Sequence, residues 1–432
     1  MADSMFAAGF KETPYWWEAA PRPSLPEAPP PATVDVAIVG SGFTGLSAAL
    51  DLARAGRSVL VLDSGDAGFG ASSRNGGMVG GQLKWSYGEL VARTGADRAR
   101  ALAREALVSL DYTKDLIERE QIACHLQKVG MFVGAHRPSH YEAMARDLDL
   151  ARKEVGVEAE MVPAQATRTE VDTAAYHGGK VMFRNAGVHP ALYHQGLLER
   201  ARNAGVTVAP LTPVEDIARC PDKAVLTTPR GKVHAREVIV ATNGYTRPVT
   251  QDLRRRLIPI GSYMIATEPL APEVMRRLFP NNRMIADTKK ILYYYRPSPD
   301  RTRVLFGGRA AVWETDTKVS GRTLHRFMTG VFPELAGVKI THSWTGNVAF
   351  TFDRLPHIGT RDGIHYAMGY CGSGVAMATH LGHKVAQRIL GTADAHTAFA
   401  DLDFPTRSWY GGEPWFLPLV ALWYRFQDRF AA

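Results

Sequence analysis

The stretch Val34–Asp63, VDVAIVGSGFTGLSAALDLARAGRSVLVLD, decides the fold of this chain of 432 residues. Its first apolar run, Val36–Val39, is rich in β-branched residues and too short for a helix, so it predicts a buried strand. A glycine-rich turn follows, and apolar residues then recur at helical spacing until Gly56. A second apolar run, Ser58–Leu62, ends at Asp63. The stretch therefore predicts a strand, a helix and a second strand in succession.

Three glycines in the turn, Gly40, Gly42 and Gly45, have the spacing of a dinucleotide-binding fingerprint. Gly40 permits the tight turn, Gly42 lets the backbone approach a pyrophosphate at the helix start, and Gly45 lets the helix pack closely on the strand. Asp63 is expected to accept hydrogen bonds from a ribose hydroxyl. Because the strand, the helix, the second strand and the acidic residue all fall at the right spacing, the stretch predicts dinucleotide binding. The alternative is a glycine-rich turn that binds no ligand.

Composition and charge narrow the class of protein. With 45% hydrophobic and 22% charged residues, the chain is an ordinary globular protein, long enough for two or three domains. The net charge of +8 is mild, and no basic block is interleaved with aromatic residues, so we expect no nucleic-acid partner. Three cysteines without CxxC spacing predict a reducing compartment, with neither a disulfide framework nor a metal site.

The two ends of the chain are expected to form an N-terminal arm and a C-terminal tail. Residues 1–33 are proline-rich and predict an extended arm, whose Trp16 and Trp17 pack on the body or on a second subunit. Near the C-terminus, Trp415–Phe426 predicts a segment packed on the domain rather than a membrane contact. Without a signal peptide or a run of about 18 apolar residues, we expect a cytoplasmic protein, either monomeric or oligomeric.

Two further glycine-rich stretches predict contacts with the same ligand. Gly65–Gly81, GDAGFGASSRNGGMVGG, has small side chains that let the chain lie flat against a ligand, and Arg74 adds a cation. A mobile surface loop is its alternative. Later, Gly369–Gly374 links a predicted strand to a predicted helix, Val375–Leu390. A helix start aimed at a redox ring can stabilise negative charge there, although a turn packed in the sheet is also consistent with the pattern.

Several segments together resemble the flavin-dependent amine and amino-acid oxidases, the family of the D-amino-acid, glycine and sarcosine oxidases. The segments are VAIVGSGFTGLSAAL, GFGASSRNGG, EVIVATNGY, WTGNVAFTFDRLPHIG and GYCGSGVAM. They follow the family's order over most of the chain. Within the family, GFGASSRNGG, LYYYRPSPD and WTGN resemble the branch that oxidises γ-glutamylputrescine.

The resemblance implies a fold and a cofactor. The fold class is α/β, with a Rossmann-like FAD-binding domain of the glutathione-reductase type and an α+β substrate domain built on a mixed sheet. The FAD-binding domain is expected to comprise 34–88, 178–250 and 340–400, and the substrate domain 89–177 and 251–339, with 401–432 as a tail. The cofactor is FAD. It is expected to be non-covalent, because Gly346 replaces the flavin-linking cysteine of sarcosine oxidases and no histidine lies in GASSRNGG.

The resemblance also implies a set of cofactor-binding residues. They are Gly40, Ser41, Gly42, Phe43, Thr44, Gly45, Asp63, Ser64, Gly70, Ala71, Ser72, Ser73, Arg74, Asn75, Gly76, Gly77, Met78, Val214, Thr242, Gly346, Gly369, Gly372, Ser373, Gly374 and Val375.

Departures from the family pattern narrow the substrate. The amino-acid oxidases carry a WxGxRP motif whose arginine binds the α-carboxylate, and here Val348 stands in its place. The second family cation, expected near Gly372 and Ala376, is also missing. A buried carboxylate without a partner costs several kcal/mol. The sequence therefore predicts an amine whose reacting carbon bears no carboxylate.

Three residues are the candidates for the substrate pocket. Tyr294 and Trp344 would supply aromatic walls, by resemblance to the sarcosine oxidases. Arg309 shares a strand face with Leu305 and Gly307 by the two-residue period, and is a candidate for a distant substrate carboxylate. Its alternative is an exposed arginine at a strand end. The lysine that sarcosine oxidases use toward oxygen is replaced near Leu305, so both O₂ and another electron acceptor are consistent with the sequence.

Three functions are consistent with the sequence. The first is FAD-dependent oxidation of a small-molecule amine, giving an imine or aldehyde, ammonia and H₂O₂. The second is an FAD dehydrogenase of N-substituted amino acids that passes electrons to a quinone. The third is a non-catalytic FAD-binding or RNA-binding protein, suggested by the net charge and the cluster Arg254–Arg256.

Overall fold

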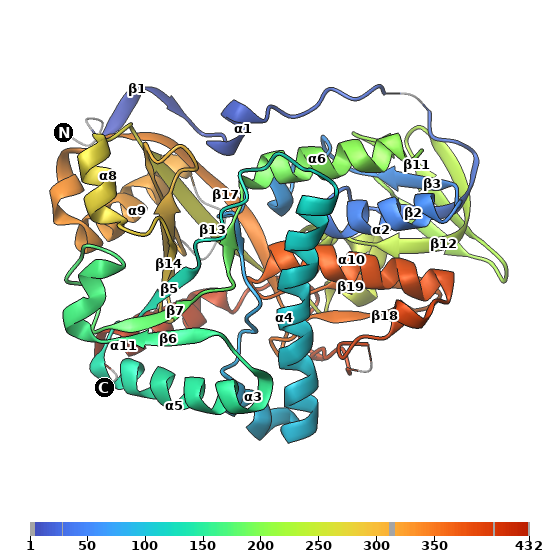
Figure 1. The fold of residues 1–432 in the computed structure, drawn as a ribbon. Coiled ribbons are helices and arrows are strands. Elements are labelled where there is room, and N and C mark those ends of the chain that lie inside the picture. Colours follow the sequence, from blue (N-terminus) through green and yellow to red (C-terminus); the bar gives the residue numbers. More distant parts are fainter. Residues whose placement is uncertain (1–4, 28, 311–315, 401, 431–432) are drawn as a thin grey trace.

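Two β-sheets organise the chain in the computed structural model, which describes residues 5–27, 29–310, 316–400 and 402–430 (Figure 1). One sheet has eight strands and the other nine. The fold class is confirmed: a nucleotide-binding unit of the predicted type stands beside a mixed-sheet unit.

The eight-stranded sheet is built around β2 (Thr33–Val39), which pairs in parallel with β3 (Val59–Leu62) and with β12 (Gly231–Val240). On its other edge, β12 pairs first with β11 (Ala224–Thr228), antiparallel, and then with β19 (Ile364–Met368), parallel. The sheet is completed by β9 (Thr207–Ala209), β10 (Asp216–Arg219) and β18 (His357–Arg361).

Helices cover one face of this sheet. As Figure 1 shows, α2 (Phe43–Arg54) lies between α6 (Pro190–Asn203) and α10 (Gly374–Leu390), and α4 (Ala96–Arg119) crosses α10. Side chains of β2 alternate between two apolar clusters: Val36 and Ile38 pack with the helices, and Ala37 packs on the opposite face. Burial on both faces explains why β2 reads as an unbroken apolar run.

The nine-stranded sheet alternates in the same way. Its order is β1 (Phe6–Lys11), β17 (Ile340–Phe350), β13 (Ile258–Thr267), β16 (Val304–Gly308), β15 (Tyr293–Pro297), β14 (Met284–Asp287), β5 (Met131–Gly134), β7 (Gly179–Met182) and β6 (Ala159–Val162). Tyr295 and Ile265 point into the cluster under α8 (Pro272–Leu278) and α9 (Thr317–Val331). Tyr294 and Met264, on the opposite face, belong to another apolar cluster. The period of two thus directs Tyr294 away from the core of its own unit.

The strand pairing differs from the predicted domain boundaries in three places. β17 lies in 340–400 and β7 in 178–250, both predicted to belong to the FAD-binding domain, yet both strands lie in the nine-stranded sheet. Pairing along the length of β13 fixes β17 there. Conversely, α4, predicted within the substrate domain, packs on α10. We therefore propose moving 340–350 and 179–182 to the substrate unit, and α4 to the FAD-binding unit.

The N-terminal arm is part of the body. β1 pairs in parallel with β17, and α1 (Trp16–Ala19) follows it. Trp16 has 0% of its surface exposed, and its indole N–H donates to the Asn75 carbonyl at 2.8 Å. Trp17 donates to the Ser73 hydroxyl at 2.9 Å. Both tryptophans thus bind the second glycine-rich stretch. They pack on the body of the protein, which is one of the two predicted alternatives.

The C-terminal segment forms α11 (Leu417–Phe430). The Asp428 carboxylate accepts hydrogen bonds from the backbone N–H groups of Lys290 and Ile291, at 2.8 and 2.9 Å, which anchors the helix beside β15. Its outer side leaves Leu422 and Trp423 exposed. None of the described helices combines the length and the apolar character that crossing a bilayer requires. The remaining elements are β4 (Met78–Val79), β8 (Ala186–Gly187), α3 (Tyr87–Thr94), α5 (Pro138–Val155) and α7 (Gln251–Arg254).

Replacing Trp16 with alanine is expected to lower the free energy of unfolding by about 3–5 kcal/mol, because it removes a fully buried indole and its hydrogen bond. Thermal unfolding followed by circular dichroism measures the effect. Trp423→Ala is the matched control, since Trp423 is 56% exposed and should tolerate the change. Equal shifts in the two midpoints would contradict the integral role of the arm.

Candidate active site

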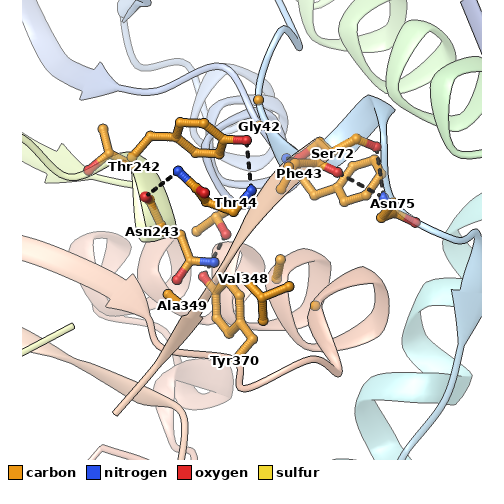
Figure 2. Close-up of a pocket in the computed structure, with 18 of the residues that line it drawn as sticks. Gly42, Phe43, Thr44, Ser72, Asn75, Thr242, Asn243, Val348, Ala349 and Tyr370 are labelled. Carbon is orange, nitrogen blue, oxygen red and sulfur yellow. Dashed lines mark hydrogen bonds between the residues drawn. The ribbon is translucent and has the colours of Figure 1, made fainter. Parts of the chain in front are cut away.

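A cavity of about 620 Å³ lies between the two sheets. Its walls come from segments far apart in sequence: the glycine turn after β2, the stretch that follows β3, the end of β12, the loop before α10 and the inner face of the nine-stranded sheet. Figure 2 shows Gly42, Thr44, Thr242, Asn243, Val348 and Tyr370 converging on it. This convergence explains why the motifs are spread over most of the chain.

The glycine turn has the geometry that its sequence predicts. Gly40 has φ +107°, a conformation that side chains disfavour. A Cβ on Gly45 would lie 2.0 Å from the Gly40 carbonyl oxygen, so only glycine permits this contact between helix and strand. α2 starts after Gly42 with no side-chain cap and no acidic residue in its first turn. Its positive end is therefore available to an anion in the cavity.

Asp63 stands at the carboxyl end of β3 and lines the cavity. Its Oδ2 accepts hydrogen bonds from the Ser41 backbone N–H at 2.8 Å and from the Ser41 hydroxyl at 2.5 Å. Its Oδ1 accepts one from the Gly65 N–H at 3.0 Å. These bonds fix the carboxylate beside the glycine turn, which suits the predicted contact with a ribose hydroxyl.

The second glycine-rich stretch is braced from within. The Asn75 side chain donates to the carbonyls of Ala71 and Ser72, and its oxygen accepts from the Gly77 N–H at 2.7 Å. Ser72 also receives the Phe43 N–H, at 2.9 Å, so the stretch is bonded to the first turn of α2 (Figure 2). The stretch is therefore a second wall of the cavity, and the alternative of a mobile surface loop does not fit these bonds.

A second helix also points its start into the cavity. α10 begins at Gly374 without a side-chain cap or an acidic residue in its first turn. The preceding loop is held by the Gly369 N–H, which donates to the Asn243 side chain at 2.9 Å, and by the Cys371 N–H, which donates to the Ala349 carbonyl at 3.0 Å. An uncapped helix start beside a redox ring favours negative charge on that ring.

The nine-stranded sheet supplies the remaining wall. Val348 of β17 lies directly opposite Ile260 of β13, and both line the cavity. The Tyr294 ring covers Gly307, where a Cβ would lie 2.3 Å from it. The Tyr294 hydroxyl is 2.8 Å from that of Ser262, and burial raises the pKa of Tyr294 to about 12. Tyr294 is therefore a neutral phenol in a largely apolar wall.

Most of the predicted site residues meet at this cavity. Those that line it are Gly40, Gly42, Phe43, Thr44, Asp63, Ser64, Gly70, Ala71, Ser72, Arg74, Asn75, Gly76, Met78, Val214, Thr242, Tyr294, Arg309, Gly346, Gly372, Ser373, Gly374 and Val375. Behind the walls lie Ser41, Gly45, Ser73, Gly77, Trp344 and Gly369.

The residues behind the walls are engaged elsewhere. Trp344 is buried, and its indole N–H donates to the Arg74 carbonyl at 2.8 Å, so it supports the wall rather than facing the cavity. Ser73 donates to the Gly68 carbonyl at 2.6 Å. Gly77 has φ +67° and lies against the Val188 carbonyl. Whether any of them contacts the cofactor through its backbone stays a prediction.

Many of the residues that line the cavity were not predicted from the sequence, Tyr245 and Lys84 among them. Tyr245 lies in the quoted segment EVIVATNGY, and its hydroxyl accepts the Asn347 N–H at 3.1 Å. Its place just after the carboxyl end of β12 could have identified it, because ligands bind at that edge of such sheets. Lys84, after the second glycine-rich stretch, had no comparable signal, since a single lysine in a loop is usually solvated.

Comparison with known proteins identifies a family and several relatives of this chain. The family model DAO, FAD dependent oxidoreductase, matches residues 35–388. The chain belongs to this family. It is 34% identical to the gamma-glutamylputrescine oxidoreductase of Escherichia coli over 92% of this chain and 93% of that protein. It is 30% identical to the probable oxidoreductase OrdL of Rhizobium meliloti, over 96% and 97% of the two chains.

Solved structures support the fold. Glycine oxidase from Geobacillus kaustophilus superposes with a TM-score of 0.73 at 22% identity, over 88% of this chain and 100% of that one. L-proline dehydrogenase from P. horikoshii gives 0.71 at 19%, over 86% and 96%. The resemblance drawn from the sequence is thus confirmed. This DAO-family member is an FAD-dependent oxidoreductase, so both the enzyme and the cofactor predictions are confirmed.

The cavity fits FAD on its own geometry. The starts of α2 and α10, neither of which is capped by its own N-cap side chain, border one space, and each can face a separate centre of negative charge. The glycine cradle is tight, since a Cβ on Gly42 would lie 2.9 Å from the Ser72 hydroxyl. Bound there, FAD would supply a ring that accepts two electrons, and the chain would hold its pyrophosphate at Gly42 and its ribose at Asp63.

Gly42→Asp is expected to weaken FAD binding at least about tenfold relative to Gly42→Ala. Both changes place a Cβ against Ser72, but only aspartate adds a carboxylate where the pyrophosphate should bind. Aspartate also caps helices well, so the thermal midpoint of the Gly42→Asp apoprotein should not fall below that of the Gly42→Ala apoprotein. Quenching of FAD fluorescence measures the affinity. Equal affinities in the two variants would contradict a pyrophosphate at this helix start.

All of the FAD is expected to leave the polypeptide on denaturation. Cys371 lines the cavity, but burial raises the pKa of its thiol to about 11, and the thiol donates to the Gly369 carbonyl at 3.2 Å. A thiol kept protonated is a poor nucleophile. Acid precipitation followed by an absorption spectrum of the supernatant measures released flavin. A fluorescent flavin band that stays with the chain on a denaturing gel would show a covalent link.

Proposed function

We propose that this enzyme oxidises a primary amine whose reacting carbon bears no carboxylate, namely γ-glutamylputrescine or a similar ω-amine. The observation that carries the proposal is the apolar pair of Val348 and Ile260 in the cavity wall. The resemblance puts Val348 where the family's amino-acid oxidases carry their carboxylate-binding arginine. An α-carboxylate at this point would be desolvated without a partner.

The similarity to the gamma-glutamylputrescine oxidoreductase of Escherichia coli supports this choice of substrate. Identity of 34% extends over nine-tenths of both chains, so it covers both sheets and the cavity between them. Among the relatives at 24% identity are glycine oxidases, for which the replacement at Val348 argues against a shared substrate. A role in the breakdown of polyamines follows from the proposed substrate.

The reaction requires little acid–base catalysis from the protein. Bound FAD would supply a ring able to take a hydride from the carbon beside the amine nitrogen and to pass the electrons on to O₂, giving H₂O₂, or to another acceptor. The resulting imine reacts with water to give the aldehyde and ammonia. The chain's part is to admit the neutral amine, orient its C–H bond and exclude water. Val348, Ile260 and the neutral Tyr294 provide such a wall.

Anaerobic reduction of the bound flavin is expected to be fastest with γ-glutamylputrescine. Stopped-flow absorbance would compare it with putrescine, glycine, sarcosine and a D-amino acid, and the last three should be slower by at least about a hundredfold because their carboxylate meets Val348. Faster reduction by any of the three would overturn the proposal. An oxygen electrode run with the best substrate then identifies the acceptor through H₂O₂.

A dehydrogenase that passes electrons to a membrane quinone is the second candidate. The observation in its favour is the outer side of α11, where Leu419 is 68%, Leu422 67% and Trp423 56% exposed. Apolar side chains on an amphipathic helix can lie in a membrane interface. Reduction of a soluble quinone analogue without formation of H₂O₂ would favour this candidate over the oxidase.

A further inference from the structure

Positive charge exceeds negative charge in the cavity wall. The cations among the described lining residues are Arg74, Lys84, Arg247 and Arg309, and Asp63 is the acidic residue among them. Of these cations, Lys84 and Arg309 lie near each other. Asp63 stands at the glycine turn, where Ser41 and Gly65 bind it. Within the part of the chain that the structure describes, neither Lys84 nor Arg309 forms an ion pair with a carboxylate.

The two cations lie close to each other although they come from different units. Arg309 directly follows β16, and Lys84 follows the second glycine-rich stretch. Burial, and after it the nearby charge of Arg309, lower the pKa of Lys84 to about 8. Burial also lowers the pKa of Arg309. Cations held together at such a cost to their solvation are typical of a site for an anion.

The position of this pair along β17 matters. The Arg309 guanidinium stacks over the Phe350 ring, 4.9 Å from its centroid, and Phe350 is two residues beyond Val348 on the same strand. Two residues of a strand span about 7 Å. The positive charge is therefore displaced along the strand from the place where the family's arginine would stand.

We propose that Lys84 and Arg309 form a subsite for a carboxylate at the end of the substrate remote from the oxidised amine. The inference rests on the proposed function, which it deepens by naming the class of substrate: an amine with an acid group several bonds away from the reacting carbon. Such a group would reach two cations while the reacting carbon lies against Val348 and Ile260.

The FAD phosphates are a poor alternative occupant of the subsite. Their predicted place is the start of α2, bordered by Gly42 and Ser72. The neighbours of the cation pair include instead Phe350 and Tyr294 of the substrate sheet and Cys371 of the loop before α10, where the ring rather than the phosphates is expected. Arg354 also lies near both cations, and Tyr424 of α11 lies near Arg309.

Two substrates that differ in one carboxylate test the subsite. γ-Glutamylputrescine and N-(4-aminobutanoyl)putrescine share the reacting amine, and the second lacks only the acid group. The wild-type holoenzyme should prefer the acid in kcat/KM for anaerobic flavin reduction by about tenfold or more. Lys84→Met and Arg309→Met should each reduce this preference several-fold, mainly through KM. Arg309→Lys should retain part of it, because it keeps the charge.

A binding measurement separates the subsite from the proposed function. Glutarate and its neutral diamide are titrated into the holoenzyme, and the change in flavin absorbance gives each Kd. Both Met variants should weaken glutarate binding about tenfold and leave the diamide unchanged. This readout does not depend on which amine is oxidised. If γ-glutamylputrescine were not a substrate but these Kd values shifted as expected, the proposed function would be contradicted and the proposed carboxylate subsite would still be supported.

Arg326→Met is the control for loss of positive charge, because Arg326 is exposed on α9 and its guanidinium stacks on Phe327. FAD content and thermal midpoint verify that each variant is folded. Unchanged glutarate affinity and unchanged substrate preference in both Lys84→Met and Arg309→Met would overturn the proposal. So would an equal loss in Arg326→Met, since the effect would then reflect net charge alone.

Discussion

The close approach of α2 to β2 is the contact on which the rest of the structure depends. With no side chain at Gly45, the helix lies against the Gly40 carbonyl, and its uncapped start faces the cavity. The same turn sets Ser41 against Asp63, which fixes the acidic residue at the sheet edge. We propose that these backbone groups and this one carboxylate would bind the two phosphates and the ribose of FAD without a cationic pocket.

The second unit completes the cavity and gives it specificity. The nine-stranded sheet buries one face in its own core and presents the other, with Tyr294, Val348 and Ile260, to the cavity. We propose that this apolar wall excludes a carboxylate beside the reacting carbon, and that the pair of cations farther along β17 favours one at a distance. Members of this family can thus differ in substrate because the positive charge of the cavity wall lies at a different position, not only because it is present or absent.

The sequence predicted the local elements well, because the glycine spacing, the apolar runs and the family motifs are all encoded locally. It assigned the residues of β17 and β7 to the FAD-binding domain, whereas both strands pair within the nine-stranded sheet, because pairing between distant strands cannot be inferred from either strand alone. It placed Trp344 in the pocket, whereas the indole is turned to the Arg74 carbonyl. Lys84 was missed for the same reason: its significance comes from Arg309, which is more than two hundred residues away in the chain.

We propose that this cavity holds FAD by its pyrophosphate and ribose as well as by its ring. The most direct measurement is the affinity of the flavin-free chain for FAD and for riboflavin, which has the ring but neither phosphate nor adenosine. We predict that FAD binds tighter by at least about tenfold, with a gap that narrows as salt screens the helix starts. Equal affinity for the two ligands, or no uptake of either, would contradict the account.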